Sequence, residues 1–430
     1  MILSHVTING LWGKPPINLK FNDSVNFMVG QNGTGKTTII NLIAAALSAD
    51  FEKIDRIEFS SMELILKPLK RGKSTKISIT KTQKSGLPYF DINYIVKTGA
   101  NGKPQVYDLD RLAEERHYRG VPSRLMRELT MRTGGFADLN RTLAELVQLT
   151  HLSVNRVVAD FKTEARPSSD KNITNPVDQK LDTIINQLVR LFSKLDRESA
   201  EAATNFQRDS FVSLLSIETT SLFKSAVQKL QTSKEADSLS RALNEIGVDQ
   251  KKTSSVISAL FKNFDTARQK IQNGEGMSLQ EFIVLADALR ANSLVQKYDA
   301  LQIQRRNIFS LRDSFLEEVN KLFGPRKTIA INERNELEAK SQDGRVIRPM
   351  DLSSGEKQLL IILGEALLQD RQSVIFIADE PELSLHVSWQ EKLVPAITRI
   401  NSNAQIIFAT HSPDIVGAYA SSVSVMEDIW

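Results

Sequence analysis

The chain has 430 residues, of which 41% are hydrophobic, so it is long enough to bury a core in two domains or in one domain with an insertion. It contains no cysteine, which excludes disulfides, a thiol nucleophile and cysteine-based zinc sites, and we expect a cytoplasmic protein. The 55 basic and 51 acidic residues give a net charge of +4, which does not by itself indicate a nucleic-acid partner. The apolar runs at residues 359–363 and 374–378 are too short to cross a bilayer, and the first residues lack a signal-peptide pattern. We therefore expect a soluble protein with no membrane partner.

The first part of the chain, about residues 1–100, favours strands with one helix. We expect strands at residues 2–8, 25–29, 57–66 and 76–80. Residues 38–47 have the composition of a helix, and polar or glycine-rich breaks at residues 70–73 and 99–103 separate the strands.

The middle part, about residues 160–325, has the 3.6-residue apolar spacing of helices. One apolar stripe consists of Leu181, Ile184, Ile185, Leu188, Leu191, Phe192 and Leu195. A later helix carries apolar residues at seven-residue steps from Leu301 to Leu322, but Glu318 interrupts the companion positions of a regular coiled coil. We expect a bent helical bundle or a short antiparallel arm that ends at Gly324 and Pro325.

The last part, about residues 326–430, alternates between strands and helices. We expect strands at residues 328–331, 346–347, 374–378 and 405–409, and helices at residues 356–368 and 389–400. The unbroken apolar strands suit a parallel sheet that is covered on both faces. The predicted organisation is an N-terminal lobe at residues 1–160, a helical insertion at 161–325 and a C-terminal lobe at 326–430.

Residues 30–37 read GQNGTGKT, which is the phosphate-binding pattern GxxxxGK[ST] between a predicted strand and a predicted helix. Glycines let backbone N–H groups surround phosphate oxygens, and the helix N-terminus favours an anion. We expect Lys36 to reach the β- and γ-phosphates of ATP and Thr37 to ligate Mg²⁺. The nucleotide-binding residues predicted in this segment are Gly30, Asn32, Gly33, Thr34, Gly35, Lys36, Thr37 and Thr38.

The apolar strand at residues 374–378 runs directly into Asp379 and Glu380. A carboxylate at the carboxyl end of a buried parallel strand points into the crevice where nucleotides bind. Asp379 would then hold Mg²⁺, directly or through water, and Glu380 would polarise the attacking water. Taken alone, Asp379 and Glu380 are equally compatible with a structural turn between a strand and a helix that is capped by acidic residues. The presence of a phosphate-binding loop in the same chain favours the catalytic interpretation.

Residues 352–358 read LSSGEKQ and open a predicted helix, with Ser353 and Glu356 at the spacing of a capping box. The segment resembles the LSGGQ signature of ABC-class ATPases, with Ser354 in place of the first glycine. Together with FIADEPELSLH and FATHSP further along, it is similar to the SMC, RecF and OLD branch of that class. More than 300 residues separate Gly35 from Leu352, which leaves room for a long insertion. The resemblance implies an α/β ABC-type ATPase head, with a mixed sheet of parallel core and antiparallel part, and a long helical insertion.

In that class the signature serine of one subunit contacts the γ-phosphate on the phosphate-binding loop of another. The resemblance therefore implies a head-to-head dimer with composite sites, to which Ser353 and Gly355 contribute, and gives His411 the role of sensing the γ-phosphate. It places residues 381–386 at the dimer interface, although His386 is equally compatible with a packed core. The class also uses a glutamine that senses Mg²⁺ and water, for which Gln83 and Gln148 both stay open.

With these motifs and no nuclease motif, the chain resembles the separate ATPase subunits of bacterial anti-phage systems, most of all PARIS and then Septu. The resemblance implies an ATP-hydrolysing sensor or scaffold that forms a homo-oligomer, responds to a phage-derived trigger and controls a separate nuclease or toxin subunit. OLD nucleases continue with a Toprim domain, and only residues 412–430 follow His411, so we expect no nuclease domain in this chain.

Two alternatives stay open. One is a RecF- or SMC-like DNA-repair ATPase that binds DNA directly, and the other is an ATP-binding structural protein with negligible turnover. Basic residues gather at positions 67–76 and 111–132, where they either bind phosphate or an acidic protein or form an ordinary solvated surface.

Overall fold

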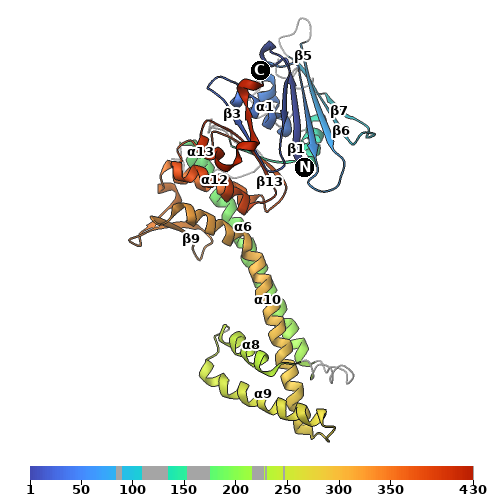
Figure 1. Ribbon diagram of the computed structural model, residues 1–430, viewed down its shortest axis with the longest axis vertical. Helices are drawn as coiled ribbons and strands as arrows, with labels where there is room; N and C mark the ends of the chain where they lie inside the picture. Colours follow the sequence, from blue (N-terminus) through green and yellow to red (C-terminus); the bar gives the residue numbers. More distant parts are fainter. Residues whose placement is uncertain are drawn as a thin grey trace. The chain divides into compact units, whose positions relative to one another are not determined.

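The computed structural model describes residues 1–83, 90–108, 134–152, 175–215, 227, 230–245 and 247–429. The chain divides into two compact units. The first, hereafter the head, comprises Met1–Val189 and Arg312–Trp430, and the second, hereafter the helical unit, comprises Arg190–Leu311. Helices α6 (Pro176–Leu215) and α10 (Leu279–Phe323) each run from one unit into the other (Figure 1). The lobe boundaries predicted near residues 160 and 325 stay predictions.

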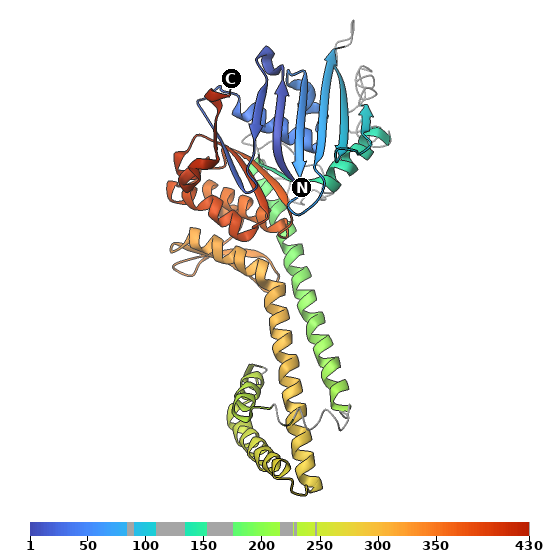
Figure 2. The same cartoon turned by 45° about the vertical axis from the view of Figure 1, so that its right-hand side comes forward.

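An antiparallel sheet forms one layer of the head, with the strand order β2-β1-β4-β5-β6-β7. Its strands are β1 (Ile2–Asn9), β2 (Ile17–Lys20), β4 (Ser61–Lys67), β5 (Thr75–Gln83), β6 (Phe90–Thr98) and β7 (Gln105–Asp108). Alternate residues are buried, as Met62, Leu64 and Leu66 are in β4, because one face of the sheet packs against the core. Figure 2 shows this sheet in front of helix α1 (Lys36–Ser48).

A second sheet in the head has the order β14-β3-β13-β12-β8, and its neighbouring strands are parallel. Its strands are β3 (Val25–Val29), β8 (Gln148–Leu152), β12 (Val374–Asp379), β13 (Ala404–Thr410) and β14 (Val423–Val425). Every residue of β12 and β13 is buried, as expected for parallel strands that are covered on both faces. The predicted α/β class with a parallel and an antiparallel part is therefore confirmed, and the two parts form separate sheets.

Helix α1 lies between these two sheets. One buried cluster joins Ile39 and Ile43 of α1 to Leu64 of the antiparallel sheet and Ile377 of the parallel sheet. Leu139 of helix α5 (Gly134–Leu146) belongs to the same cluster. Full burial of an aliphatic side chain is worth roughly 1.5–3 kcal/mol, so this core anchors the start of α1.

Helix α2 (Phe51–Arg56) corrects the expectation of one helix in the first hundred residues. The Asp50 side chain accepts a hydrogen bond from the Lys53 N–H and caps this helix, and Phe51 and Ile54 are buried. The strand expected at residues 57–66 consequently begins only at Ser61.

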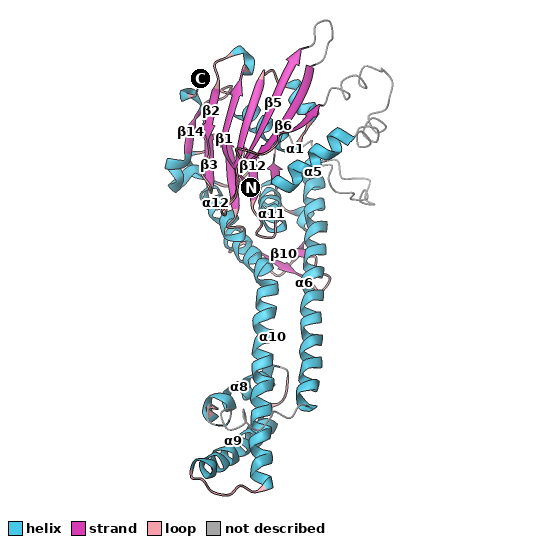
Figure 3. Cartoon of the chain, turned by 90° about the vertical axis from the view of Figure 1, so that its right-hand side faces the viewer, coloured by secondary structure: helices cyan, strands magenta, loops and turns pink. Residues whose placement is uncertain are grey.

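The remaining elements of the head include a small antiparallel sheet and three helices formed by residues 327–416 (Figure 3). The small sheet consists of β9 (Lys327–Ile331), β10 (Leu337–Ser341) and β11 (Val346–Ile347). The helices are α11 (Ser354–Leu368), α12 (Val387–Ile400) and α13 (Pro413–Val416). The described residues of the head also form the short 3-10 turns η1 (Leu11–Gly13), η2 (Pro349–Asp351), η3 (Gly417–Ser422) and η4 (Met426–Asp428). The strands and helices predicted for residues 326–430 are confirmed, and β10, α13 and β14 were missed.

The helical unit contains α8 (Thr232–Glu245), α9 (Gln250–Gln272) and the adjoining parts of α6 and α10. α6 and α10 run antiparallel, because Ser199 bonds to Arg305 while Phe206, further along α6, stacks edge-on against Tyr298, which comes earlier in α10. Phe264 of α9 is fully buried in a separate apolar cluster. The predicted helical insertion is confirmed, and no helix in the described part of the chain has the length and apolarity to span a membrane.

Glu318, which interrupts the seven-residue pattern, is only 4% exposed. In the head its carboxylate accepts hydrogen bonds from Arg399 at 2.9 Å and from Lys321 at 2.8 Å. The residue that interrupts the pattern is therefore a buried charge. Its two cationic partners are needed, because an unpaired carboxylate at a buried position would be costly.

Candidate nucleotide site

Three neighbouring parallel strands end at the same edge of the sheet. The register pairs Asp379 of β12 with Ala409 of β13, and Thr410 of β13 with Val29 of β3. The phosphate-binding loop, the acidic pair and His411 therefore meet at one edge, although they lie far apart in the sequence. Carboxyl ends of parallel strands are where α/β folds bind ligands.

The phosphate-binding loop closes around its own lysine. Gly35 has φ of 91°, a conformation that side chains disfavour, and it immediately precedes α1. Lys36 is 5% exposed, and its Nζ donates to the carbonyls of Gly30 at 2.7 Å and Gln31 at 2.9 Å. Burial lowers the pKa of Lys36, and the surrounding carboxylates oppose that shift. The lysine charge is thus held inside the loop, where a bound phosphate would meet it.

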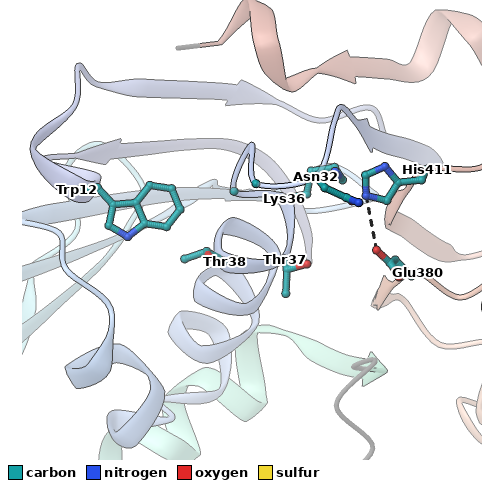
Figure 4. A pocket seen from close by; sticks show the side chains of 9 residues that line it. Trp12, Asn32, Lys36, Thr37, Thr38, Glu380 and His411 are labelled. Carbon is teal, nitrogen blue, oxygen red and sulfur yellow. Dashed lines mark ion pairs between the residues drawn. The ribbon is translucent and has the colours of Figure 1, made fainter.

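A cavity of about 220 Å³ opens beside the loop (Figure 4). It is lined by Trp12, Asn32, Gly33, Gly35, Lys36, Thr37, Thr38, Glu380 and His411. All of these except Trp12 are residues that the sequence predicts for the site. The other loop residues lie close by, since the Thr34 hydroxyl donates to the Gln31 carbonyl at 2.8 Å.

Thr37 and Asp379, the two residues predicted to hold Mg²⁺, are in contact with each other. The Thr37 hydroxyl donates to Asp379 Oδ1 at 3.2 Å, and Asp379 is 4% exposed. Burial raises the pKa of Asp379, while the hydrogen bond from Thr37 acts in the opposite direction. Hydroxyl and carboxylate oxygens beside a phosphate loop are ligands that Mg²⁺ prefers, so these residues fit the ion.

We expect Asp379→Asn to stabilise the nucleotide-free protein at neutral pH. A carboxyl whose pKa is raised on folding contributes stability below its unfolded pKa and loses that contribution as pH rises through the folded pKa. Removing the charge should therefore add about 0.5–2 kcal/mol to the free energy of unfolding at pH 7, and the gain should vanish in acid. Thermal unfolding at several pH values measures it, with the exposed Asp428→Asn as control. An equal gain at all pH values would contradict the electrostatic explanation.

Glu380 and His411 face each other at the cavity. Glu380 Oε1 lies 3.6 Å from His411 Nε2, and the two side chains are 32% and 34% exposed. Glu380 has φ of 45°, unusual for a residue with a side chain, and its N–H donates to the Ala409 carbonyl at 2.8 Å. Such backbone strain costs of order 1 kcal/mol and is concentrated at functional sites. In Figure 4 both side chains lie across the loop from Trp12.

Glu382 belongs to the segment predicted at the dimer interface, and the structure gives it a contact with the site that the sequence did not predict. Its Oε1 accepts hydrogen bonds from the Thr410 hydroxyl and from the His411 N–H, the latter at 3.1 Å. It therefore holds the backbone that carries His411. Its place two residues after Glu380 was the available signal, but only the folded chain brings β12 and β13 together.

The signature segment begins helix α11. The Ser353 hydroxyl accepts from the Glu356 N–H at 3.4 Å, and Glu356 accepts in return from the Ser353 N–H at 2.9 Å, which completes the capping box. Gly355 is buried, and a Cβ there would lie 2.4 Å from the Ser384 carbonyl oxygen. The position that requires glycine is thus Gly355, and the exposed Ser354 is compatible with the fold.

Ser353 and Gly355 are not among the residues that line the cavity of the same head. Ser353 is exposed, so its hydroxyl and the start of α11 are accessible from outside. The structure therefore brings together the phosphate-binding loop, the acidic pair and His411, and leaves the signature segment apart from them.

Other predicted candidates lie elsewhere. His386 is exposed and caps α12 by accepting from the Ser388 N–H, so its interpretation as a packed core residue is wrong. Gln148 lies level with Val374, at the end of the parallel sheet opposite the loop, where its side chain bonds to Gln372. Gln83 ends β5 in the antiparallel sheet. The arginine-rich cluster at residues 111–132 falls outside the described residues. The other basic cluster, at residues 67–76, lies around the turn between β4 and β5.

The fold and the residues at the strand ends define a P-loop ATPase domain. The chain belongs to the family described as "AAA domain, putative AbiEii toxin, Type IV TA system", whose profile matches residues 163–417, more than half of the chain. The predicted membership of an ATPase class that includes anti-phage proteins is thereby supported.

Two curated relatives match shorter parts. The retron Ec83 probable ATPase of Escherichia coli is 34% identical over 15% of this chain and 14% of its own length. The Septu protein PtuA of Bacillus thuringiensis is 39% identical over 16% of this chain and 21% of its own length. The matched region therefore spans less than a quarter of either relative. The predicted resemblance to a Septu ATPase is confirmed, and the one to PARIS stays a prediction.

The solved structures that match this chain include SMC heads. The Smc head domain of Pyrococcus furiosus with an extended coiled coil, bound to the C-terminal domain of ScpA, has a TM-score of 0.39 and 11% identity, over 96% of this chain and 90% of that chain. The SMC head domain from Thermotoga maritima has a TM-score of 0.36 and 12% identity, over 97% and 91%.

Proposed function

We propose that the chain hydrolyses ATP at composite sites, each made from the cavity of one head and the signature segment of a second copy. The observation that carries the proposal is the division of the predicted site: Lys36, Glu380 and His411 line one cavity, whereas Ser353 is exposed and absent from it. The cavity of about 220 Å³ is also smaller than the roughly 300–1,000 Å³ of pockets that enclose a drug-sized ligand. A second head would complete the enclosure.

Each residue has a defined task in this proposal. The N–H groups of the loop and Lys36 hold the β- and γ-phosphates. Thr37 and Asp379 would hold Mg²⁺, which would supply positive charge to the phosphate oxygens. Glu380 orients the attacking water and accepts its proton, because its carboxylate reaches the cavity. His411, placed by Glu382, donates toward the γ-phosphate.

Trp12 provides a surface for the nucleotide base. It lines the cavity on the side away from Glu380, is 40% exposed, and has a φ of 52° in the turn η1 (Figure 4). Its indole ring therefore stands where the base would lie when the phosphates occupy the loop. The glycine at position 10, which adopts a φ of 69°, was a local signal of a turn. Nothing in the sequence linked that turn to the phosphate-binding loop.

We expect Trp12→Ala to weaken ATP binding about tenfold, since stacking of a base on an aromatic ring is worth about 1–3 kcal/mol. Trp12→Phe keeps an aromatic face and should retain most of the affinity. Calorimetric titration with ATP and Mg²⁺ measures both. Turnover at saturating ATP should change little, because the ring does not touch the reacting phosphate. Equal affinity of all three proteins would exclude base stacking at this position.

We further propose that the ATPase is the sensor or scaffold subunit of an anti-phage system and controls a separate nuclease or toxin subunit. The family description contains a toxin of a toxin–antitoxin system, and the curated relatives are named as parts of a retron and of Septu. Pairing of heads around ATP would bring together two helical units and any subunit bound to them, and a phage-derived trigger would act on that state.

The defence proposal is tested in cells that carry the gene with its neighbours. Protection against phage should be lost with Lys36→Ala, and an effector subunit should copurify with the wild-type chain. Unchanged plaque numbers after deletion of the gene, across a broad phage panel, would refute the defence role while leaving the ATPase intact.

Direct DNA binding is a second candidate function, and one feature of the antiparallel sheet favours it. One row across five strands on its exposed side consists of Lys20, His5, Ile65, Lys76 and Lys97. The exposed Lys70, Arg71 and Lys73 follow in the adjacent turn. Glu63 pairs with Lys76 at 2.7 Å and compensates part of this charge. Lysines spread over a flat face suit a phosphate backbone.

This alternative predicts that duplex DNA stimulates ATP turnover and that Lys20→Glu with Lys97→Glu removes the stimulation. DNA binding with a steep salt dependence, lost in the same double variant, would support it. Turnover that is indifferent to DNA would leave the defence proposal as the better one.

A further inference from the structure

The turn η4 lies against the first peptide of the phosphate-binding loop. β14 pairs in parallel with β3 so that Val425 is level with Val29, and η4 therefore begins where β3 gives way to the loop. Met426 is fully buried beneath this contact. A Cβ on Gly30 would lie 2.8 Å from Glu427 Oε2 and 3.0 Å from the Met426 Cβ. The first glycine of the motif thus leaves room for η4.

Glu427 holds the backbone of the loop directly. Its Oε1 accepts a hydrogen bond of 2.6 Å from the Gln31 N–H. The carbonyl of the same peptide group, that of Gly30, accepts from Lys36 Nζ at 2.7 Å. One peptide is therefore held by an anion at its N–H and by a cation at its C=O. Hydrogen bonds to charged groups are stronger than neutral ones, and bonds linked in this way polarise one another.

We infer that Glu427 is a positioning residue of the ATP site: it fixes the Gly30–Gln31 peptide, and through that peptide the direction of Lys36, and so raises the affinity for ATP. The inference rests on the proposed function, because it concerns the same nucleotide site. Glycine-rich loops lose much conformational freedom when they close on a phosphate. An anchor at the entrance of the loop lowers that cost before the ligand arrives.

Two other roles for Glu427 make different predictions. A carboxylate close to Lys36 would repel a triphosphate if charge alone mattered, and its removal would then strengthen ATP binding. A purely structural contact would lower the stability of the nucleotide-free head and leave the affinity for ATP unchanged. The positioning role predicts weaker ATP binding, whether or not the stability of the nucleotide-free head falls as well.

Calorimetric titration of the full chain with ATP and Mg²⁺ distinguishes these roles. We expect Glu427→Ala to bind ATP about five- to tenfold more weakly than wild type, the range for loss of one charge-assisted bond at a partly solvated position. Glu427→Gln keeps an oxygen that can accept from the Gln31 N–H and should stay within about twofold of wild type. Asp428→Ala, exposed in the same turn, is the matched control and should bind normally.

Thermal unfolding without nucleotide should give a cooperative transition for all three proteins, with a midpoint for Glu427→Ala at or slightly below that of wild type, because the bond to Gln31 is already present without nucleotide. Wild-type or tighter ATP binding by Glu427→Ala, or failure of Glu427→Gln to restore affinity, would each overturn the inference. A wild-type chain that does not bind ATP would overturn the proposed function itself. Normal binding by wild type and by Glu427→Ala alike removes only the role of Glu427.

Discussion

A Glu380→Gln variant is expected to hydrolyse ATP about 10²–10⁴ times more slowly than wild type, the usual contribution of a general base. The amide has nearly the shape of the carboxylate but cannot take a proton from water. Lys36, Thr37 and Asp379 are untouched, so ATP and Mg²⁺ should still bind. The rate of phosphate release and a titration with ATP measure the two effects separately.

The same variant should accumulate as ATP-bound pairs of heads. In the proposed mechanism hydrolysis separates the paired heads, so light scattering with ATP should show a larger species for Glu380→Gln than for wild type. Glu391→Gln, an exposed glutamate of α12, is the matched control and should behave like wild type. Wild-type turnover by Glu380→Gln would favour the alternative of an ATP-binding structural protein.

The three central strands of the parallel sheet were predictable because they are largely buried on both faces, whereas the partly buried β8 and β14 were missed. Burial on two faces requires an unbroken apolar run, which residues 25–29, 374–378 and 405–409 supply. The polar residues that follow each run then had to share one edge of the sheet. Asp379 beside Thr37, and Glu380 beside His411, follow from this rule and from the spacing of the motifs.

The contacts that complete the site were not predictable, because they join segments that no local pattern connects. Trp12 reaches the cavity from a turn between β1 and β2. Glu382, which follows β12, accepts a hydrogen bond from His411, which follows the neighbouring strand β13. Glu427 reaches Gln31 from η4. Gln148 shows the same limit from the opposite side. Its type suited a glutamine sensor, but the register of β8 places it at the far end of the sheet.

A mixed pair of two inactive chains is expected to recover activity, and this result depends most directly on the composite site. Lys36→Ala disables the cavity of its own chain, and Ser353→Arg places a large cation at the start of α11. In a mixed pair, one site combines both defects, while the other combines an intact cavity with an intact signature segment. Co-expression with two different tags and sequential purification would isolate such pairs, which should show about half of the wild-type turnover if the two sites of the symmetric pair act independently.

A second mixed pair provides the control. Lys36→Ala with Glu380→Gln carries one defect in each cavity, because both side chains line the cavity of their own head, so neither site should recover. The loss of the Ser353 cap costs about 1 kcal/mol, which leaves the fold intact and keeps the comparison between the two pairs fair. If turnover recovers in the first mixed pair but not in the second, one chain must supply the cavity and the other must supply Ser353. Normal turnover by Ser353→Arg as an isolated monomer would instead mean that one head hydrolyses ATP alone, and the exposed serine would then have no role in the reaction.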